Sequence, residues 1–241
     1  MRRALFALVL AGAALLVWLA AHELPWAVRA WTVFLLVALP ALLVAQAKAL
    51  AHIEGLPRTE VYISSIVSLW ALAALTLFAS RAAGIGLVEL GVVGERVASV
   101  VLWTAGTIAV AIGMLFLAQA LGVTEARIVA LLLPRTRRER WVFALLSVTA
   151  GVCEELVFRG FLLPVLADAT GSLALALVLS SGAFGIMHAY QQPAGAARAT
   201  LLGMLLAVPF LATGSLLPSI LAHAGIDLLA GLVLRDRLLK R

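Results

Sequence analysis

Apolar runs close to twenty residues long recur along the whole chain and restrict the folds that are open to it. A helix of about 20 apolar residues is needed to cross the hydrocarbon core of a bilayer. The composition agrees, because 64% of the 241 residues are hydrophobic and only 12% are charged, unlike a typical soluble domain. The sequence therefore predicts an all-α polytopic membrane protein of about eight transmembrane helices, at 4–21, 30–46, 61–79, 98–121, 141–167, 173–190, 199–213 and 215–234.

Basic residues are distributed unevenly between the connections of these segments. Lys and Arg are retained on the cytoplasmic side of membrane proteins. With a cytoplasmic N-terminus, 14 of the 18 Lys and Arg residues fall in cytoplasmic connections or termini, Arg159 lies within a span, and only Arg29, Arg81 and Arg96 fall outside. We therefore expect both termini to face the cytoplasm, in a membrane of the bacterial cytoplasmic type. The first segment is expected to be an uncleaved span, since it is longer than the apolar core of a signal peptide.

The same distribution accounts for the net charge of +6. These residues serve as topology signals and as contacts for membrane lipids. They do not alternate with aromatic residues, as they would on a nucleic-acid surface. The sequence predicts membrane lipids as partners and no nucleic acid.

Ionisable residues inside the apolar segments divide the chain into two parts. Residues 1–139 hold N-terminal spans almost free of such groups and end in a basic cytoplasmic connector, whereas residues 140–241 hold all the others. Each charge costs about 2.5 to 3.5 kcal/mol at the centre of a spanning helix. The C-terminal part is therefore expected to be the functional bundle, and its ionisable residues are Glu154, Glu155, Arg159, His188, His223 and Asp227.

Helical spacing groups these residues into polar faces. Glu155 and Arg159 are four apart and share a face, so we expect them to form an ion pair. Glu154 is rotated from Glu155 by about 100°, which leaves it free to face a cavity. The pairs Phe184 with His188 and His223 with Asp227 have the same spacing on two further segments. Small residues near these faces are expected to permit close helix approach, at Gly151, Gly182, Gly185 and Gly225.

In this order, the Glu-Glu-x-x-x-Arg, Phe-x-x-x-His and His-x-x-x-Asp motifs resemble those of the CAAX protease and bacteriocin-processing family. This group of intramembrane proteases is also called Abi or type II CAAX endopeptidases. The resemblance covers residues 140–234 and implies hydrolysis of a peptide bond in a membrane-associated peptide or protein. It implies that Glu154 is the general base and that His188 helps to hold the water. It further implies that Glu155 and Arg159 support the site.

The resemblance also implies that His223 and Asp227 stabilise the oxyanion. Members of the family often have Asn in place of Asp227, and an ionised Asp cannot donate a hydrogen bond. Asp227 is therefore either protonated or orients His223 by accepting from its ring N–H. A divalent metal such as zinc is a further option, with Glu154, His188 and His223 as ligands. The chain has no H-E-x-x-H motif, so no cofactor is certain.

Two other classes of function fit part of the pattern. Carboxylates and histidines within spans also form proton relays, so a proton- or ion-coupled transporter is one alternative. Transporters often carry internal repeats, which this chain does not show. A non-catalytic membrane scaffold or immunity protein with the same fold is the other alternative. The sequence does not reveal the substrate or whether it is prenylated.

Overall fold

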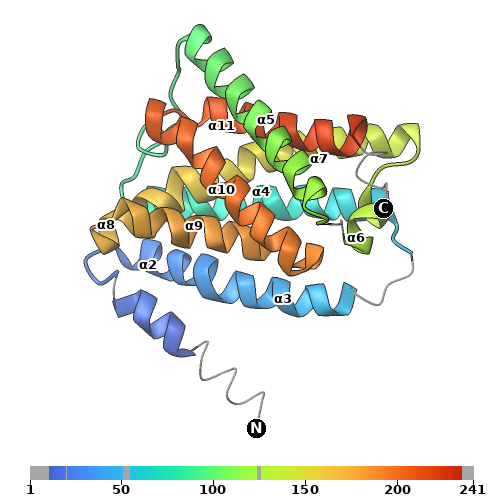
Figure 1. Ribbon diagram of the computed structural model, residues 1–241. Helices are drawn as coiled ribbons and strands as arrows, with labels where there is room; N and C mark the ends of the chain where they lie inside the picture. The colour runs from blue at the N-terminus through green and yellow to red at the C-terminus, as the bar shows by residue number, and fades with distance from the viewer. Residues whose placement is uncertain (1–10, 20, 51–54, 124–125, 235–241) are drawn as a thin grey trace.

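The computed structural model consists of helices joined by short connections and forms a layered bundle (Figure 1). It describes all residues except 1–10, 20, 51–54, 124–125 and 235–241. Within the described ranges there is no β-strand, which confirms the all-α prediction. The main helices are α2 Trp26–Val33, α3 Leu39–Leu50, α4 Arg58–Ala82, α5 Val97–Ala120, α6 Arg127–Leu132, α7 Arg137–Glu155, α8 Leu163–Thr170, α9 Leu173–Met187, α10 Gln192–Thr213 and α11 Leu217–Leu228.

Several helices continue through turns of different pitch. Three are π-helical, at Phe34–Ala38, Leu156–Leu162 and Leu229–Val233, and Ala189–Gln191 is a 3₁₀ turn. The first joins α2 to α3 and the second joins α7 to α8, so that each pair crosses the bundle as one continuous helix. The predicted segments from 30–46 onward fall mainly on helices, although the helix within 173–190 ends at Met187 and the helix within 215–234 begins at Leu217. The segment at 4–21 begins outside the described residues, and residues 11–19 of it are helical.

Five continuous helices are long and apolar enough to cross a membrane, within the described part of the chain. Two further apolar helices, Leu173–Met187 and Leu217–Val233, are shorter. The chain is thus an integral membrane protein with several apolar helices. The five long ones are Trp26–Ala47, Arg58–Ala82, Val97–Ala120, Arg137–Thr170 and Ala189–Thr213.

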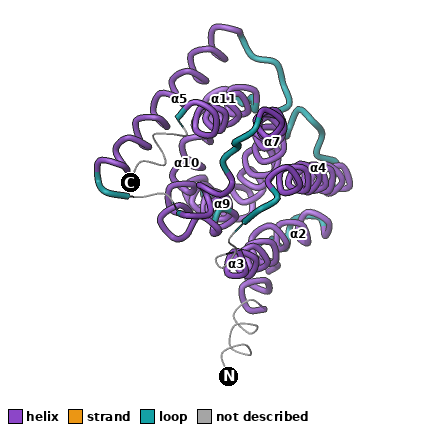
Figure 2. The backbone as a smooth tube through the Cα atoms, turned by 90° about the vertical axis from the view of Figure 1, so that its right-hand side faces the viewer, coloured by secondary structure: helices purple, strands orange, loops and turns teal. Residues whose placement is uncertain are grey.

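Helix α7 occupies the middle of the bundle. It packs against both α4 and α11, while α9 lies between α8 and α10. Figures 1 and 2 show α5 along one edge, beside α11, and α2 with α3 along the opposite edge. The helices of the predicted functional half are therefore flanked by helices of the N-terminal half on two opposite edges.

A capping box fixes the point at which α7 begins. The Thr136 hydroxyl accepts a hydrogen bond from the Glu139 backbone N–H at 3.2 Å, and the Glu139 carboxylate accepts one from the Thr136 N–H at 2.9 Å. This reciprocal arrangement satisfies two donors that a helix start otherwise leaves unpaired. Because Glu154 and Glu155 lie on the same helix, the cap sets their depth in the bundle.

Close contacts between helices occur at three of the four glycines singled out in the sequence. A Cβ on Gly151 would lie 2.8 Å from the Ile220 carbonyl oxygen of α11, and one on Gly185 would lie 2.7 Å from the Ala196 carbonyl oxygen of α10. Gly225 meets α5 in the same way. The prediction for Gly182 was wrong, because nothing lies within 4 Å of its Cβ position. Its helix faces open space there, which the spacing of small residues does not reveal.

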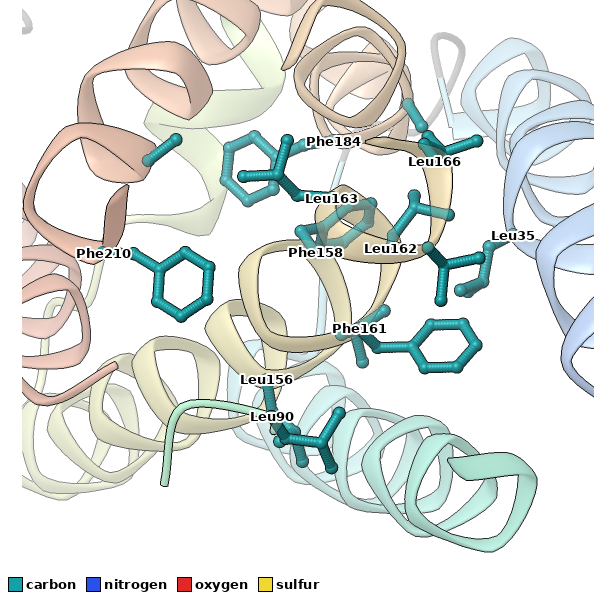
Figure 3. Close-up of a cluster of buried hydrophobic side chains, with 14 of the residues drawn as sticks. Leu35, Leu90, Leu156, Phe158, Phe161, Leu162, Leu163, Leu166, Phe184 and Phe210 are labelled. Atoms are coloured by element: carbon teal, nitrogen blue, oxygen red, sulfur yellow. The ribbon is translucent and has the colours of Figure 1, made fainter. Parts of the chain in front are cut away.

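The hydrophobic core gathers around the π-helical turn that follows α7. Figure 3 shows aromatic and leucine side chains of this turn meeting Phe184 of α9 and Leu35 of the N-terminal helices. Leu90, in the connection between α4 and α5, is also buried there. The core thus holds the C-terminal end of α7 firmly from several sides.

Candidate active site

Glu155 and Arg159 form the ion pair that their spacing predicts. Arg159 Nη1 lies 2.7 Å from Glu155 Oε1, and both side chains are buried. The second amino group, Nη2, donates to the Gly203 carbonyl oxygen of α10 at 2.8 Å. Arg159 therefore links α7 to α10 as well as neutralising its partner. The bond to Gly203 could not be predicted, because 44 residues separate the two positions.

The oxygen of Glu155 that binds Arg159 also contacts His223 of α11. Nδ1 of His223 lies 2.7 Å from Oε1 of Glu155, within hydrogen-bond distance. An ionised carboxylate can only accept, so His223 Nδ1 is the donor to it. This contact fixes the ring and directs its other nitrogen, Nε2, away from Glu155.

Two more carboxylates lie near the Nε2 side of His223. Glu154 Oε2 is 3.9 Å and Asp227 Oδ2 is 3.8 Å from this nitrogen. Both distances exceed a direct hydrogen bond. Among the described residues, Glu154 Oε2 is buried without a hydrogen-bond partner. A buried carboxylate oxygen without a partner is uncommon in proteins, and it marks this position as a candidate functional group.

His188 joins the cluster through an aromatic contact. It follows the last residue of α9, and its Nδ1 lies 3.0 Å from the Phe184 carbonyl oxygen. Because a carbonyl only accepts, Nδ1 is the donor and Nε2 is left for another partner. The Phe184 ring lies between the histidines, with centroid distances of 4.9 Å to His188 and 5.8 Å to His223.

The same ring also covers the buried cation of the ion pair. The guanidinium carbon of Arg159 lies 4.6 Å from the centroid of Phe184. Such a contact adds to the stabilisation of a desolvated arginine. Arg159 of the ion pair and both histidines therefore pack against the Phe184 ring.

A cavity of about 430 Å³ adjoins this cluster, and its wall includes His188, His223 and Asp227. The six ionisable residues identified in the sequence thus lie in one connected group. They are carried by α7 with its π turn, by the end of α9 and by α11. Of the six, only His188, His223 and Asp227 line the cavity, whereas Glu154, Glu155 and Arg159 do not.

The described side chains do not form a three-ligand metal set. In the part of the chain that the structure describes, no three His, Cys, Asp or Glu side chains converge on a point that could hold a metal ion. His223 uses Nδ1 for Glu155, and His188 uses Nδ1 for a backbone carbonyl. The set of Glu154, His188 and His223 considered from the sequence is therefore not assembled as a metal site.

The fold and the cluster together define a helical membrane protein with an acid–histidine site in its interior. Residues 136–229 match the family described as type II CAAX prenyl endopeptidase Rce1-like. No curated protein and no solved structure is significantly similar to the chain. The family match confirms the resemblance seen in the motifs, over residues 136–229. It supports a CAAX-type intramembrane endopeptidase.

Proposed function

We propose that this protein hydrolyses a peptide bond of a membrane-associated peptide or protein, with Glu154 as the general base for the attacking water. The observation that most directly supports this proposal is the position of the Glu154 carboxylate. Its Oε2 atom is buried and without a hydrogen-bond partner among the described residues, and it is 3.9 Å from the nitrogen of a histidine that lines a cavity. Contacts longer than a hydrogen bond between polar groups are commonly bridged by water.

In the proposed reaction, water binds between Glu154 and the histidines. His188 Nε2 holds it by accepting one of its hydrogens, and Glu154 removes the other proton as the oxygen attacks the peptide carbonyl carbon. The new C–O bond converts the carbonyl into a tetrahedral oxyanion. The C–N bond then breaks, and Glu154 returns the proton to the leaving nitrogen. General base catalysis of this kind contributes about 10²- to 10⁴-fold to a rate.

The oxyanion is stabilised by His223 and Asp227 in this proposal. His223 donates to Glu155 from Nδ1 and, when doubly protonated, to the oxyanion from Nε2. Asp227 does not accept from the ring within hydrogen-bond distance, since its nearest oxygen is 3.8 Å from Nε2. We therefore favour the protonated form of Asp227, in which the carboxylic acid donates to the oxyanion. One such donor is worth about 10²- to 10³-fold in kcat.

Glu155 and Arg159 are positioning residues in this mechanism. Glu155 balances the charge of Arg159 and also holds His223, while Arg159 fixes the carboxylate against α10 through Gly203. Neither needs to touch the substrate. The proposed mechanism uses no metal ion.

We also propose that both termini face the cytoplasm, because this orientation leaves only three basic residues in external connections. The membrane is then of the bacterial cytoplasmic type. The cavity is accessible from the membrane or from the cytoplasmic end of the bundle.

The test compares Glu154→Gln with the wild-type protein in detergent, using a hydrophobic reporter peptide. Glu60→Gln is the matched control, because Glu60 is an exposed glutamate in the first turn of α4. We expect Glu154→Gln to abolish cleavage while thermal unfolding stays close to that of the wild type, and the control to stay active. Cleavage by Glu154→Gln at the wild-type rate would refute the base assignment. Ion flux in proteoliposomes without peptide cleavage would instead favour a transporter.

A further inference from the structure

The wall of the cavity beside the histidines combines apolar and polar residues. Most of its lining is aliphatic, and its polar and charged residues are His188, Gln191, Arg198, His223 and Asp227. A peptide whose carbonyl reaches these residues must place its neighbouring side chains in the remaining space. The chemistry of that space therefore bears on which substrates fit.

One wall of the cavity comes from α5, a helix that lies outside the matched family segment. The lining residues on this side include Ala111, Leu115 and Ala118 of α5 and Leu121, which directly follows the helix. Successive members are three or four residues apart and so form one face of the helix. Two of them are alanines, which keep this wall far from the opposite one. Residues of α10, such as Leu202, line the cavity as well.

The cavity also reaches the outer surface of the bundle. Leu117 of α5, Leu121 just after α5 and Leu201 of α10 line it, yet each exposes more than half of its surface. In a membrane protein, exposed leucines of this kind face lipid. This side of the cavity is therefore expected to face lipid.

We propose that the α5 face formed by Ala111, Leu115 and Ala118 determines which side chain is accepted next to the scissile bond. This inference rests on the proposed function and names the chemistry of the substrate at that position. The preferred side chain is aliphatic and uncharged, of about the size of leucine, because the α5 wall offers no polar partner. The two alanines set the width of the space.

The position of α5 supports this assignment. It packs against α11, which carries His223 and Asp227, and also against α10 (Figure 2). Gly225 of α11, two residues from His223, brings the helices close, since a Cβ there would lie 2.8 Å from Ile108 Cδ1 of α5. Direct packing between helices therefore fixes the position of the α5 face relative to the polar cluster.

The experiment narrows the wall with Ala118→Phe and widens it with Leu115→Ala. Ala109→Phe is the matched control, because Ala109 lies on the same helix, is exposed and does not line the cavity. Each variant is assayed in detergent on peptides that differ only in one residue beside the cleaved bond, which is Ala, Val, Leu or Phe. One methylene in such a pocket changes kcat/KM by about 10- to 200-fold.

For Ala118→Phe, we expect the leucine-to-alanine ratio of kcat/KM to fall at least about tenfold. Leu115→Ala should raise the phenylalanine-to-leucine ratio, and Ala109→Phe should leave both ratios unchanged. Unchanged ratios in both lining variants, with folding shown by thermal unfolding, would overturn the proposal.

A binding assay tests the role of the α5 face independently of the proposed catalytic mechanism. Fluorescence anisotropy of the same labelled peptides is measured on Glu154→Gln, with and without Ala118→Phe. We expect Ala118→Phe to weaken binding of the leucine peptide relative to the alanine peptide, whether or not any variant cleaves. Loss of cleavage from the wild type alone would count against the proposed function, whereas equal shifts in Kd for both peptides would count against the α5 wall.

Discussion

Nδ1 of His223 lies 2.7 Å from Oε1 of Glu155, although the two residues are 68 positions apart in the chain. The same oxygen is 2.7 Å from Nη1 of Arg159. One carboxylate oxygen therefore connects the buried cation of α7 to the histidine of α11. Because all three side chains are buried, the loss of one member leaves the others without their charge partner.

Replacement of Glu155 by Gln should destabilise the protein strongly. The amide keeps the shape of the side chain, but the charge of Arg159 is then buried without compensation, which costs about 3 to 5 kcal/mol. Thermal unfolding in detergent measures the effect. Glu155→Gln combined with Arg159→Met should recover part of the loss, because the second change removes the unpaired charge. If the single variant unfolds at the wild-type temperature, the ion pair does not hold the bundle.

Replacement of Asp227 separates two roles of its side chain. If Asp227 donates to the oxyanion, Asp227→Asn should keep kcat within a few-fold, because an amide also donates a hydrogen bond. Asp227→Ala should lower kcat by about 10²- to 10³-fold, the usual effect of losing one oxyanion donor. Steady-state kinetics on one peptide checks both. Equal losses in the two variants would show that the carboxylate itself is required.

Local features of the site could be predicted from the sequence because they depend on helical spacing. Glu155 and Arg159 share a face at four residues apart, and the structure brings them to 2.7 Å. The grouping of Glu154, His188 and His223 followed from the cost of charged and polar groups in lipid. Charged and polar groups inside spans need partners or a common function, however the helices pack.

Contacts between distant segments could not be predicted in the same way. Glu155 contacts His223, and the Gly203 carbonyl oxygen accepts a hydrogen bond from Arg159. Both contacts depend on how α7, α10 and α11 cross. Periodicity within one helix does not determine such crossings. The π-helical turn at Leu156–Leu162 gave no signal either, because no residue type in it specifies a π turn and its extra residue per turn is fixed by packing.

The contribution of the N-terminal half to the cavity could not be predicted from the sequence either. Residues 1–139 contain almost no ionisable groups within spans, and the sequence therefore indicated a passive role. In the structure, Ala111 and Ala118 of α5 line the cavity beside the polar cluster. Aliphatic residues that line a cavity have the same composition as those that face lipid, so only the three-dimensional arrangement separates them.

Two glycines of α9 offer a matched test of its packing. A Cβ on Gly185 would lie 2.7 Å from the Ala196 carbonyl oxygen, whereas Gly182 has nothing within 4 Å. Gly185→Ala should therefore force α9 and α10 apart and cost about 1 to 3 kcal/mol. Gly182→Ala should be neutral or stabilising by up to about 1 kcal/mol, because alanine favours the helix. Unfolding temperatures of the two variants measure the contrast, and similar values would contradict the close contact at Gly185.

Removal of metal ions should leave peptide cleavage unchanged. A catalytic zinc site needs about three protein ligands around one point, and no three such side chains converge in the described part of the chain. Nδ1 of His223 is also taken by Glu155, which leaves this ring a single nitrogen for any other partner. The measurement is kcat after dialysis against a chelator, with residual metal determined by elemental analysis and with added zinc as the control. Loss of activity that zinc restores would mean that Glu154, His188 and His223 rearrange into a metal site, and the proposed role of Glu154 as a base would have to be replaced by that of a ligand.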